Sequence, residues 1–273
     1  MPYANDNGVK LWYDLNGSGE PLVVTGGFGL LHDQFAYIRD LLTPHLQVID
    51  WHYRGAGLSD RAWPGGYPFD RWVDDLEVIL DQAGLGTVHL WGTSTGAPLN
   101  VRFAARHPER VKSLITYPGV SFSPESRRMF QVFQDVTEAF GYEALGRLTQ
   151  WIGSAEHNVF GDRANEIALF EIESFKRNFS IPSLAKTLET FAHCELSADV
   201  AKLTMRVLVL MGNSGHLGAA TPGQTAAIES FTALCPHAEV RLVENGGGTY
   251  HMIEQPEQTA SVVIDFVNTH AGA

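Results

Sequence analysis

The stretch LWGTSTGAPLN, residues 90–100, decides how the rest of the chain is interpreted. It contains a G-x-S-x-G pattern centred on Ser94, which follows an apolar run and precedes the helical pattern APLNVRFAARHPER. A serine between a buried strand and a helix sits on a sharp, strained turn, and small neighbours such as Gly92 and Gly96 leave room for that turn. The stretch therefore predicts a strand, a tight turn that presents the Ser94 hydroxyl, and a helix.

On both sides of this stretch, short apolar runs alternate with amphipathic segments. One such segment, FDRWVDDLEVILDQAGLG (69–86), repeats apolar residues at three and four positions and ends at glycine, as helices do. The alternation predicts an α/β fold with a mostly parallel central sheet flanked by helices. The predicted strands are VKLWYDL (9–15), PLVVTGG (21–27), LQVIDW (46–51), TVHLWG (87–92), VKSLITY (111–117), RVLVLMG (206–212) and AEVRLV (238–243).

The interval between Tyr117 and Arg206 breaks the alternation, because it holds helical patterns and no strand-like run. We predict that residues 121–199 form a helical cap over the carboxyl edge of the sheet, while residues 1–120 and 200–273 form the core. Large aromatic residues of the cap either line a pocket or attach the cap to the core, and both interpretations stay open. They are Phe130, Phe133, Phe140, Trp151, Phe170 and Phe175.

The composition narrows the class of protein and its partners. The 273 residues are 44% hydrophobic, enough for a full core, and carry a net charge of −12. This acidity argues against binding of nucleic acid or of an anionic membrane, and no apolar run approaches the length of a membrane span. Cys194 and Cys235 occur without metal-ligand spacing. We expect a cytoplasmic protein with reduced thiols, no metal and no organic cofactor, and nothing in the sequence indicates an oligomeric state.

Two further segments supply what a reactive serine needs. A serine hydroxyl requires a base to act as a nucleophile, and acyl transfer requires hydrogen-bond donors for the oxyanion. GGGTYHMIEQPEQ (246–258) places His251 on a glycine-rich loop after the last predicted strand. TGGFGLLHDQF (25–35) places a glycine-rich turn after an early strand, where backbone N–H groups can face the serine. The sequence therefore contains candidates for the nucleophile, for the base and for the oxyanion donors.

Four segments resemble motifs of the α/β-hydrolase superfamily. TGGFG (25–29) resembles its oxyanion turn, and WHYRGAGLSD (51–60) resembles its D-x-R-G-x-G-x-S segment. GTSTG (92–96) resembles its nucleophile elbow, and YHMIEQPE (250–257) resembles its H-x-x-x-x-x-P histidine loop. The resemblance implies an α/β-hydrolase fold with a helical cap inserted after strand six.

The resemblance also assigns roles to individual residues. It implies that Ser94 is the nucleophile and that His251 is the general base. The oxyanion hole would combine the backbone N–H of Thr95 with that of Gly27 or Phe28.

The acid that completes a catalytic triad has no evident place. The loop GNSGHLGAATP (212–222), where most of the superfamily carries it, contains no carboxylate. A minority, including haloalkane dehalogenases and fungal zearalenone lactonases, carries it after the preceding strand, but residues 117–119 are tyrosine, proline and glycine here. Three interpretations remain. Glu125 or a cap residue supplies the acid, Asn213 or another neutral group orients His251, or the triad is incomplete.

These observations predict a hydrolase that cleaves a small, mostly apolar carboxylic ester or lactone through a Ser94 acyl-enzyme, with His251 as general base. One alternative keeps the fold but changes the chemistry to C–C bond cleavage or cofactor-free oxygenation. Another is a protein that binds a small ligand and retains only vestigial turnover. Epoxide hydrolysis and dehalogenation are excluded, because both require a carboxylate nucleophile at the elbow, where this chain has Ser94.

Overall fold

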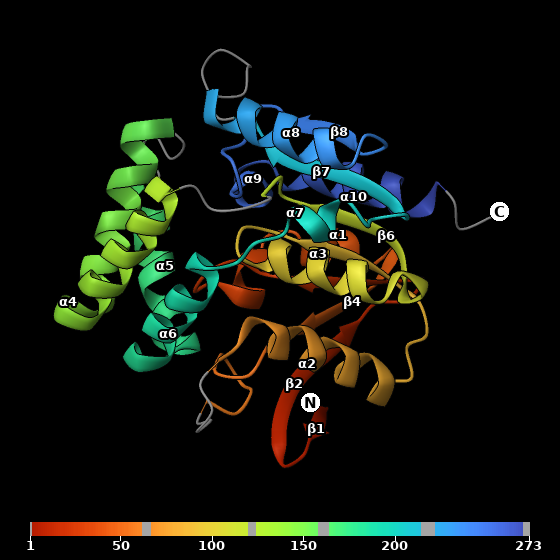
Figure 1. The fold of residues 1–273 in the computed structure, drawn as a ribbon, viewed down its shortest axis with the longest axis horizontal. Coiled ribbons are helices and arrows are strands. Elements are labelled where there is room, and N and C mark those ends of the chain that lie inside the picture. The colour runs from red at the N-terminus through yellow and green to blue at the C-terminus, as the bar shows by residue number, and fades with distance from the viewer. Residues whose placement is uncertain (1, 62–66, 120–123, 158–163, 214–221, 270–273) are drawn as a thin grey trace.

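A single twisted sheet forms the centre of the computed structural model, which describes residues 2–61, 67–119, 124–157, 164–213 and 222–269. The order of the strands across the sheet is β1-β2-β4-β3-β5-β6-β7-β8. The β1–β2 and β2–β4 pairs are antiparallel, and every other neighbouring pair is parallel. The predicted mostly parallel α/β architecture is therefore confirmed (Figure 1).

Every predicted strand is present, with bounds that shift by a few residues at most. One strand, β1 (Tyr3–Asp6), is not among the predicted ones. It pairs with β2 through a turn at Asn7 and Gly8, which have φ values of 51° and 93°. Asn-Gly is a strong hairpin signal, so the sequence did contain evidence for this strand. The remaining strands are β2 (Val9–Asn16), β3 (Glu20–Thr25), β4 (Leu46–Trp51), β5 (Val88–Gly92), β6 (Val111–Thr116), β7 (Arg206–Gly212) and β8 (Glu239–Val243).

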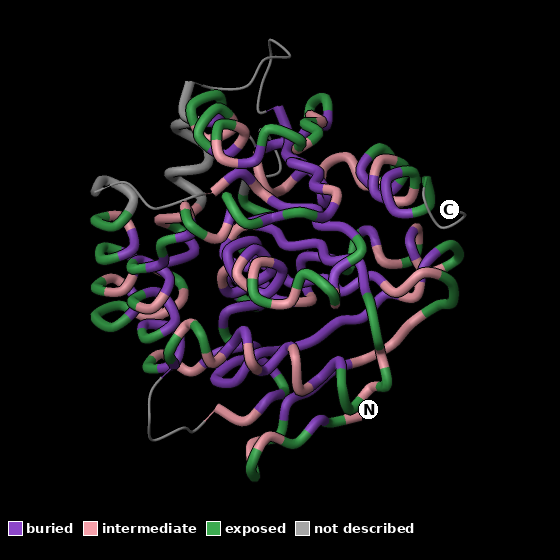
Figure 2. Tube along the Cα trace, turned by 45° about the vertical axis from the view of Figure 1, so that its right-hand side comes forward, coloured by how far each residue is buried: buried purple, intermediate pink, exposed green. Residues whose placement is uncertain are grey.

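Helices cover both faces of the sheet and bury an apolar cluster on each. On one face, Trp72 and Phe103 are fully buried, and on the other, Leu42 and Phe266 are fully buried. Figure 2 shows the buried strands between helices that are exposed on their outer sides. The helices of the core are η1 (Leu31–Phe35), α1 (Arg39–Leu42), α2 (Phe69–Gln82), α3 (Gly96–Arg106), η2 (Pro108–Arg110), α7 (Ser197–Val200), α8 (Pro222–Leu234), α9 (His251–Glu254) and α10 (Pro256–Asn268).

Of the four described helices between β6 and β7, the three that precede α7 form the insertion that the sequence predicts after strand six. They are α4 (Pro124–His157), which is interrupted at Gly141 with φ 79°, α5 (Ala164–Asn178) and α6 (Ile181–Ala192). The three helices lie together at one side of the core (Figure 1). All of them fall within residues 121–199, and the division into a core and a separate cap domain stays a prediction.

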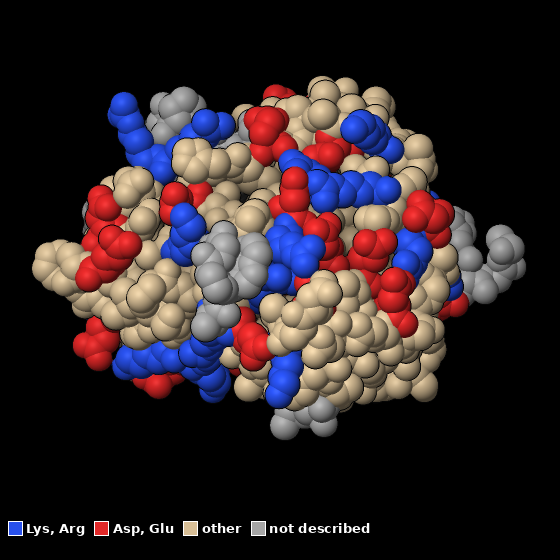
Figure 3. Space-filling model, turned by 60° about the horizontal axis from the view of Figure 1, so that its bottom comes forward, with Lys and Arg blue, Asp and Glu red and all other residues tan. Residues whose placement is uncertain are grey.

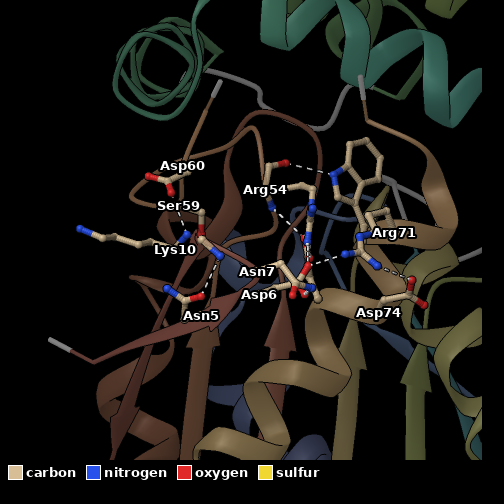
Figure 4. A network of polar contacts seen from close by, with 12 residues as sticks. Asn5, Asp6, Asn7, Lys10, Arg54, Ser59, Asp60, Arg71 and Asp74 are labelled. Atoms are coloured by element: carbon tan, nitrogen blue, oxygen red, sulfur yellow. Dashed lines mark hydrogen bonds and ion pairs between the residues drawn. The ribbon is translucent and has the colours of Figure 1, made fainter. Parts of the chain in front are cut away.

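A buried ion-pair network fixes the loop after β4 to α2 and to the N-terminal hairpin. The Arg54 guanidinium is 1% exposed and binds both carboxylate oxygens of Asp75, which is 0% exposed. It also donates to Asp6 at 2.6 Å, and Asp6 accepts a second bond of 2.6 Å from Arg71 (Figure 4). Burying both charges is tolerable only because each carboxylate and the guanidinium are paired.

The face of the molecule that Figure 3 shows carries charges of both signs. On the face that Figure 3 shows, acidic and basic side chains are interspersed. None of the helices in the described part of the chain has the length and apolar character that a membrane crossing would need.

Candidate active site

Ser94 lies two residues beyond the end of β5, at the carboxyl edge of the parallel strands. Ligands of open α/β sheets bind at this edge. Ser94 lines two hollows, of about 230 and 260 Å³, that also share Met129 and Phe130 of α4. We call the first of them the Ser94 cavity. Its lining residues are Gly27, Phe28, Leu30, Gln34, Ser94, Thr95, Met129, Phe130, Phe133, Thr149, Glu171, Phe175, Thr249 and Tyr250.

The backbone around Ser94 forms the predicted strand–turn–helix. Ser94 has φ 50°, in the left-handed region that a side chain with a Cβ rarely adopts. The turn is tight enough that a Cβ on Gly92 would lie 2.7 Å from the Cα of Ala97. A Cβ on Gly96 would lie 2.2 Å from the carbonyl oxygen of Thr25, so no side chain fits at either glycine. Strain held in place by close packing is typical of a residue positioned for function.

Three backbone N–H groups are candidates for the oxyanion hole, and one of them is already occupied. Gly27 N–H donates to Gln34 Oε1 at 2.8 Å. The N–H groups of Phe28 and Thr95 have no acceptor among the hydrogen bonds of the described residues. Gly27 nevertheless faces the serine, because a Cβ built on it would lie 2.7 Å from Ser94 Cβ. Phe28 and Thr95 are therefore the two predicted donors whose protons are available.

His251 is buried behind the wall of the Ser94 cavity. It is 1% exposed, its ring lies 6.5 Å from that of Trp91, and its Nδ1 lies 3.0 Å from Thr259 Oγ1. The loop residues that line the cavity are Thr249 and Tyr250, and His251 is not among them. No hydrogen bond between described residues joins Ser94 Oγ to His251. The predicted role of His251 as general base stays a prediction.

The hydrogen bonds of Thr259 are compatible with the tautomer of His251 that carries its proton on Nδ1. Thr259 Oγ1 lies 3.2 Å from the carbonyl oxygen of His251 and donates its single proton there. The hydroxyl oxygen then accepts from Nδ1–H, which leaves a lone pair on Nε2. This is the tautomer that a general base requires. Thr259 is a residue that the sequence analysis did not consider.

Of the two residues predicted to replace the triad acid, only Asn213 has a described side chain, and no hydrogen bond joins it to His251. The Asn213 side-chain oxygen accepts from the backbone N–H of Asn245 at 2.9 Å, which fixes the loop after β8. Glu125 lies in the first turn of α4, but its side chain lies outside the described residues. Residues 214–221, in the loop without a carboxylate, are also outside them. The contact to Nδ1 therefore comes from a neutral hydroxyl.

Burial lowers the pKa of His251 to about 3, from an ordinary value of 6.5. A histidine whose folded pKa is depressed contributes stability above its unfolded value, and this contribution is lost as the pH falls toward the folded value. We expect His251 to contribute about 2–3 kcal/mol less to the free energy of unfolding at pH 4.5 than at pH 7.5. Urea unfolding at the two pH values measures this, with His251→Asn as the control in which the loss should be smaller by that amount. If the native and His251→Asn proteins lose the same free energy of unfolding between pH 7.5 and pH 4.5, His251 is not the group with the depressed pKa.

Most of the Ser94 cavity is apolar, and cap aromatics supply much of its wall. Phe130, Phe133 and Phe175 are buried and line it, as one of the two predictions for the cap residues proposes. Phe140 is 75% exposed, and Phe170 packs against Tyr37, so neither contributes. The side chain of Trp151 lies outside the described residues.

One wall of the Ser94 cavity carries a polar cluster, which we call the Glu171 cluster and which consists of Glu171, Tyr250 and Thr149. Tyr250 Oη is hydrogen-bonded to Glu171 Oε1, and Thr149 Oγ1 lies 2.7 Å from Glu171 Oε2. Thr149 Oγ1 also lies 3.0 Å from the carbonyl oxygen of Gly146. Burial raises the pKa of Glu171, and the two hydroxyl contacts only partly oppose this.

Another hollow, of about 430 Å³, is unrelated to Ser94. It lies between α2, α3 and α6, and its lining includes Arg102 and Asp70. These charges are already paired, since Arg102 binds Asp70 at 2.7 Å and Asp199 at 2.5 Å. In the part of the chain that the structure describes, no group of three or more histidine, cysteine, aspartate or glutamate side chains could hold a metal ion. The Ser94 cavity is therefore the candidate active site.

Comparison with known proteins agrees with this architecture. Residues 20–253 match the alpha/beta hydrolase fold family, and the chain belongs to that family. It is 23% identical to a putative carbamate hydrolase RutD of Caulobacter vibrioides, over 94% of this chain and 95% of that protein. A shorter match of 30% identity spans 54% of this chain and 56% of the RutD protein of Azorhizobium caulinodans.

Solved structures show the same fold. A carboxylesterase structure from Nitrososphaera gargenis superimposes with a TM-score of 0.83 at 20% identity, covering 98% of each chain. The enol-lactonase from Burkholderia xenovorans LB400 superimposes with a TM-score of 0.79 at 20% identity, covering 97% of this chain and 99% of that one.

Proposed function

We propose that the chain hydrolyses a small, mostly apolar carboxylic ester or lactone through an acyl-enzyme on Ser94. The observation that carries the proposal is the strained turn at Ser94, which stands beside the available N–H groups of Phe28 and Thr95. The apolar cavity in front of it suits an uncharged acyl group. Similar proteins are named for the hydrolysis of carbamates and as a carboxylesterase and an enol-lactonase, which supports the same class of reaction.

The reaction would proceed in two steps. Ser94 Oγ attacks the carbonyl carbon, and the N–H groups of Phe28 and Thr95 hydrogen-bond the oxyanion. The C–O bond to the alcohol then breaks, the leaving oxygen takes a proton, and the acyl group remains as an ester on Ser94. Water attacks this ester in the second step, which releases the acid and restores the hydroxyl.

His251 is the proposed acceptor of the Ser94 proton. Its Nε2 carries the necessary lone pair, and catalytic hydrogen bonds that are long in a free enzyme often tighten when substrate binds. A neutral Thr259 hydroxyl orients the ring but does not stabilise the imidazolium that forms. Loss of the triad acid costs about 10⁴ in turnover, so we expect a slow hydrolase.

The role of Thr259 can be tested by two substitutions. Thr259→Val removes the acceptor of the Nδ1 proton at nearly constant shape, and Thr259→Ser keeps it. We expect the valine variant to lose about tenfold in kcat, the equivalent of one hydrogen bond of about 1.4 kcal/mol, and the serine variant to stay close to native. Equal kcat values in all three proteins would show that His251 is not oriented by Thr259 for catalysis.

A panel of small substrates tests the proposed function itself. It contains p-nitrophenyl esters with acyl chains of two to eight carbons and γ-, δ- and ε-lactones. We expect turnover of uncharged, apolar members and none of esters with an anionic acyl chain, because the cavity wall is mostly aromatic and carries no cation among its described lining residues. The proposal fails if no member is hydrolysed faster by the native protein than by Ser94→Ala.

A second candidate is a small-ligand-binding protein with vestigial turnover. The missing Ser94–His251 hydrogen bond and the neutral partner of Nδ1 favour it. In that case the panel compounds would bind without being cleaved, and the serine would not react with an acylating or phosphonylating probe.

A further inference from the structure

The side chain of Gln34 lines the Ser94 cavity, and the proposed reaction does not use it. Gln34 lies on η1, directly after the glycine-rich turn of residues 25–29, and is 1% exposed. A side-chain amide carries both an acceptor and a donor, so it can join a backbone N–H to a backbone carbonyl. Gln34 does this, because its Oε1 accepts from Gly27 N–H at 2.8 Å and its Nε2 donates to the carbonyl oxygen of Thr249 at 3.1 Å. One buried side chain thus links the oxyanion turn to the loop that leads to His251.

Gly27 is the residue of the oxyanion turn that this link restrains. Glycine has more accessible backbone conformations than any other residue, so its peptide units need outside partners to stay in one orientation. The Gly27 carbonyl accepts from the N–H groups of Leu30 and Leu31, each at 3.2 Å. Since a trans peptide is planar, the Phe28 N–H points opposite to that carbonyl. The bond to Gln34 holds the other side of Gly27 and so helps to fix the direction of a proposed oxyanion donor.

Gln34 also lies close to the nucleophile. A Cβ built on Gly27 would lie 3.0 Å from Gln34 Oε1, 2.7 Å from Ser94 Cβ and 3.3 Å from Ser94 Oγ. The amide and the serine therefore flank the same glycine, and no side chain fits between them. A shift of Gln34 would reach the oxyanion turn directly, and catalysis is sensitive to displacements of about 1 Å.

The second partner of Gln34 belongs to another glycine-rich segment. Residues 246–248 are all glycine, and Gly248 has φ 41°, in the left-handed region. Thr249 follows them, lines both hollows of the site and precedes His251 by two residues. A segment with so few side chains has little packing of its own to hold it. The hydrogen bond from Gln34 restrains it at Thr249, a residue of the cavity wall.

We propose that Gln34 is a positioning residue, whose side-chain amide holds the oxyanion turn and the His251 loop at a fixed separation beside Ser94. The inference rests on the proposed function, because it concerns the rate of the reaction at Ser94. Gln34 neither accepts nor supplies a proton in that reaction and acts through Phe28 and His251.

Gln34→Met tests the proposal, because methionine keeps the length of the side chain and can make neither hydrogen bond. Steady-state kinetics would use the p-nitrophenyl ester that the native protein hydrolyses fastest. We expect kcat to fall about 10–100-fold, as the loss of one or two hydrogen bonds made to the reacting geometry implies. KM should change by less than about threefold, because the apolar wall of the cavity is retained. Urea unfolding of the same variant gives the fraction that is folded in the assay.

Gln82→Met is the matched control. Gln82 makes the same pair of bonds elsewhere, since its Oε1 accepts from Asn5 N–H at 2.9 Å and its Nε2 donates to the Asn5 carbonyl at 2.8 Å. It is an exposed residue at the end of α2 and does not line the Ser94 cavity. Its replacement should leave kcat at the native value.

Gln34→Glu provides a readout that a purely structural role would not move. A neutral carboxylic acid accepts from one backbone group and donates to the other, as the amide does, whereas a carboxylate places an oxygen without a proton against the Thr249 carbonyl. Burial raises the pKa of such a carboxyl, so the kcat of Gln34→Glu relative to native should rise about fivefold or more from pH 8 to pH 5. Glu171, Tyr250 and His251 are common to both proteins, so their titration cancels in the ratio.

The inference is overturned if Gln34→Met and Gln82→Met have the same kcat, or if the ratio for Gln34→Glu does not change with pH. It is also overturned if Gln34→Met lowers only the urea midpoint and leaves kcat per folded molecule unchanged. If Gln34→Met does not fold, the pH dependence of Gln34→Glu decides alone. Failure of the proposed function looks different, because the native protein would then hydrolyse none of the esters and both proposals would fall together.

Discussion

Replacement of Ser94 by alanine is expected to lower kcat for a small ester by about 10²-fold, far less than in a hydrolase with a full triad. In a complete triad, loss of the serine costs about 2 × 10⁶ in kcat and loss of the acid alone about 3 × 10⁴. The described partner of His251 Nδ1 is a hydroxyl, so most of the cost of a missing acid is already present in the native protein. Dividing the factor for loss of the serine by the factor for loss of the acid leaves about 10² in kcat that depends on the serine itself.

Steady-state kinetics of the native and Ser94→Ala proteins measure this effect. Ser113→Ala is a matched control, because Ser113 is another buried serine and lies on β6, outside the Ser94 cavity. Its hydroxyl is hydrogen-bonded to His89 at 2.7 Å. The kcat of Ser113→Ala should stay within about twofold of native. A loss near 10⁶ in Ser94→Ala would reveal a complete triad, with an acid outside the described residues. No loss at all would exclude Ser94 as the nucleophile.

Replacement of Asp75 by alanine is expected to destabilise the protein by about 3–5 kcal/mol, the cost of leaving a buried charge without its partner. Asp75 holds the Arg54 guanidinium through both carboxylate oxygens and accepts the backbone N–H of Arg54 at 3.1 Å. Asp6 is shared between Arg54 and Arg71, so it does not replace the bonds that Asp75 makes to Arg54. The change should lower the urea midpoint strongly while leaving the slope of the transition nearly constant.

The neighbouring aspartate provides the control for this prediction. Asp74 is on the same helix and pairs with Arg71 at 3.4 Å. The Asp74 side chain is 43% exposed and the Arg71 side chain is 35% exposed. Exposed ion pairs contribute little to stability, so Asp74→Ala should lower the free energy of unfolding by less than about 1 kcal/mol. If Asp75→Ala and Asp74→Ala lower the free energy of unfolding by similar amounts, burial does not determine how much the Arg54–Asp75 pair contributes to stability.

The fold could be predicted from the sequence because each signal was local. Apolar runs of strand length, glycine-terminated helices and the strand–turn–helix around Ser94 all depend on neighbours in the chain. The pocket prediction for the cap aromatics needed tertiary structure, since Phe130, Phe133 and Phe175 line the Ser94 cavity whereas Phe140 and Phe170 do not.

The histidine loop illustrates where motif reasoning fails to fix geometry. Four residues separate His251 from Pro256, one fewer than in the H-x-x-x-x-x-P pattern of the superfamily. At the start of a helix, one residue turns a side chain by about 100°. The buried position of His251, and the presence of Thr249 and Tyr250 in the cavity, agree with such a shift.

The Thr259 and Glu171 contacts could not be predicted, although a weak signal existed for Glu171. Thr259 reaches His251 from the next helix, and no sequence pattern links a hydroxyl to an imidazole eight residues away. Glu171, however, lies four residues from both Ile167 and Phe175, which are buried. A carboxylate at that spacing faces the apolar side of its helix, where an ionisable group indicates a special environment.

The central claim is that Ser94 is an activated nucleophile in a site with a working oxyanion hole. Intact-protein mass after incubation with a fluorophosphonate tests it most directly, in the native, Ser94→Ala and His251→Ala proteins. We expect a single, slowly formed adduct on the native protein that is absent from Ser94→Ala and forms more slowly still in His251→Ala. If the native protein forms no adduct, or if the Ser94→Ala protein forms the same adduct equally fast, Ser94 is not an activated nucleophile, and ligand binding is left as the function of the cavity.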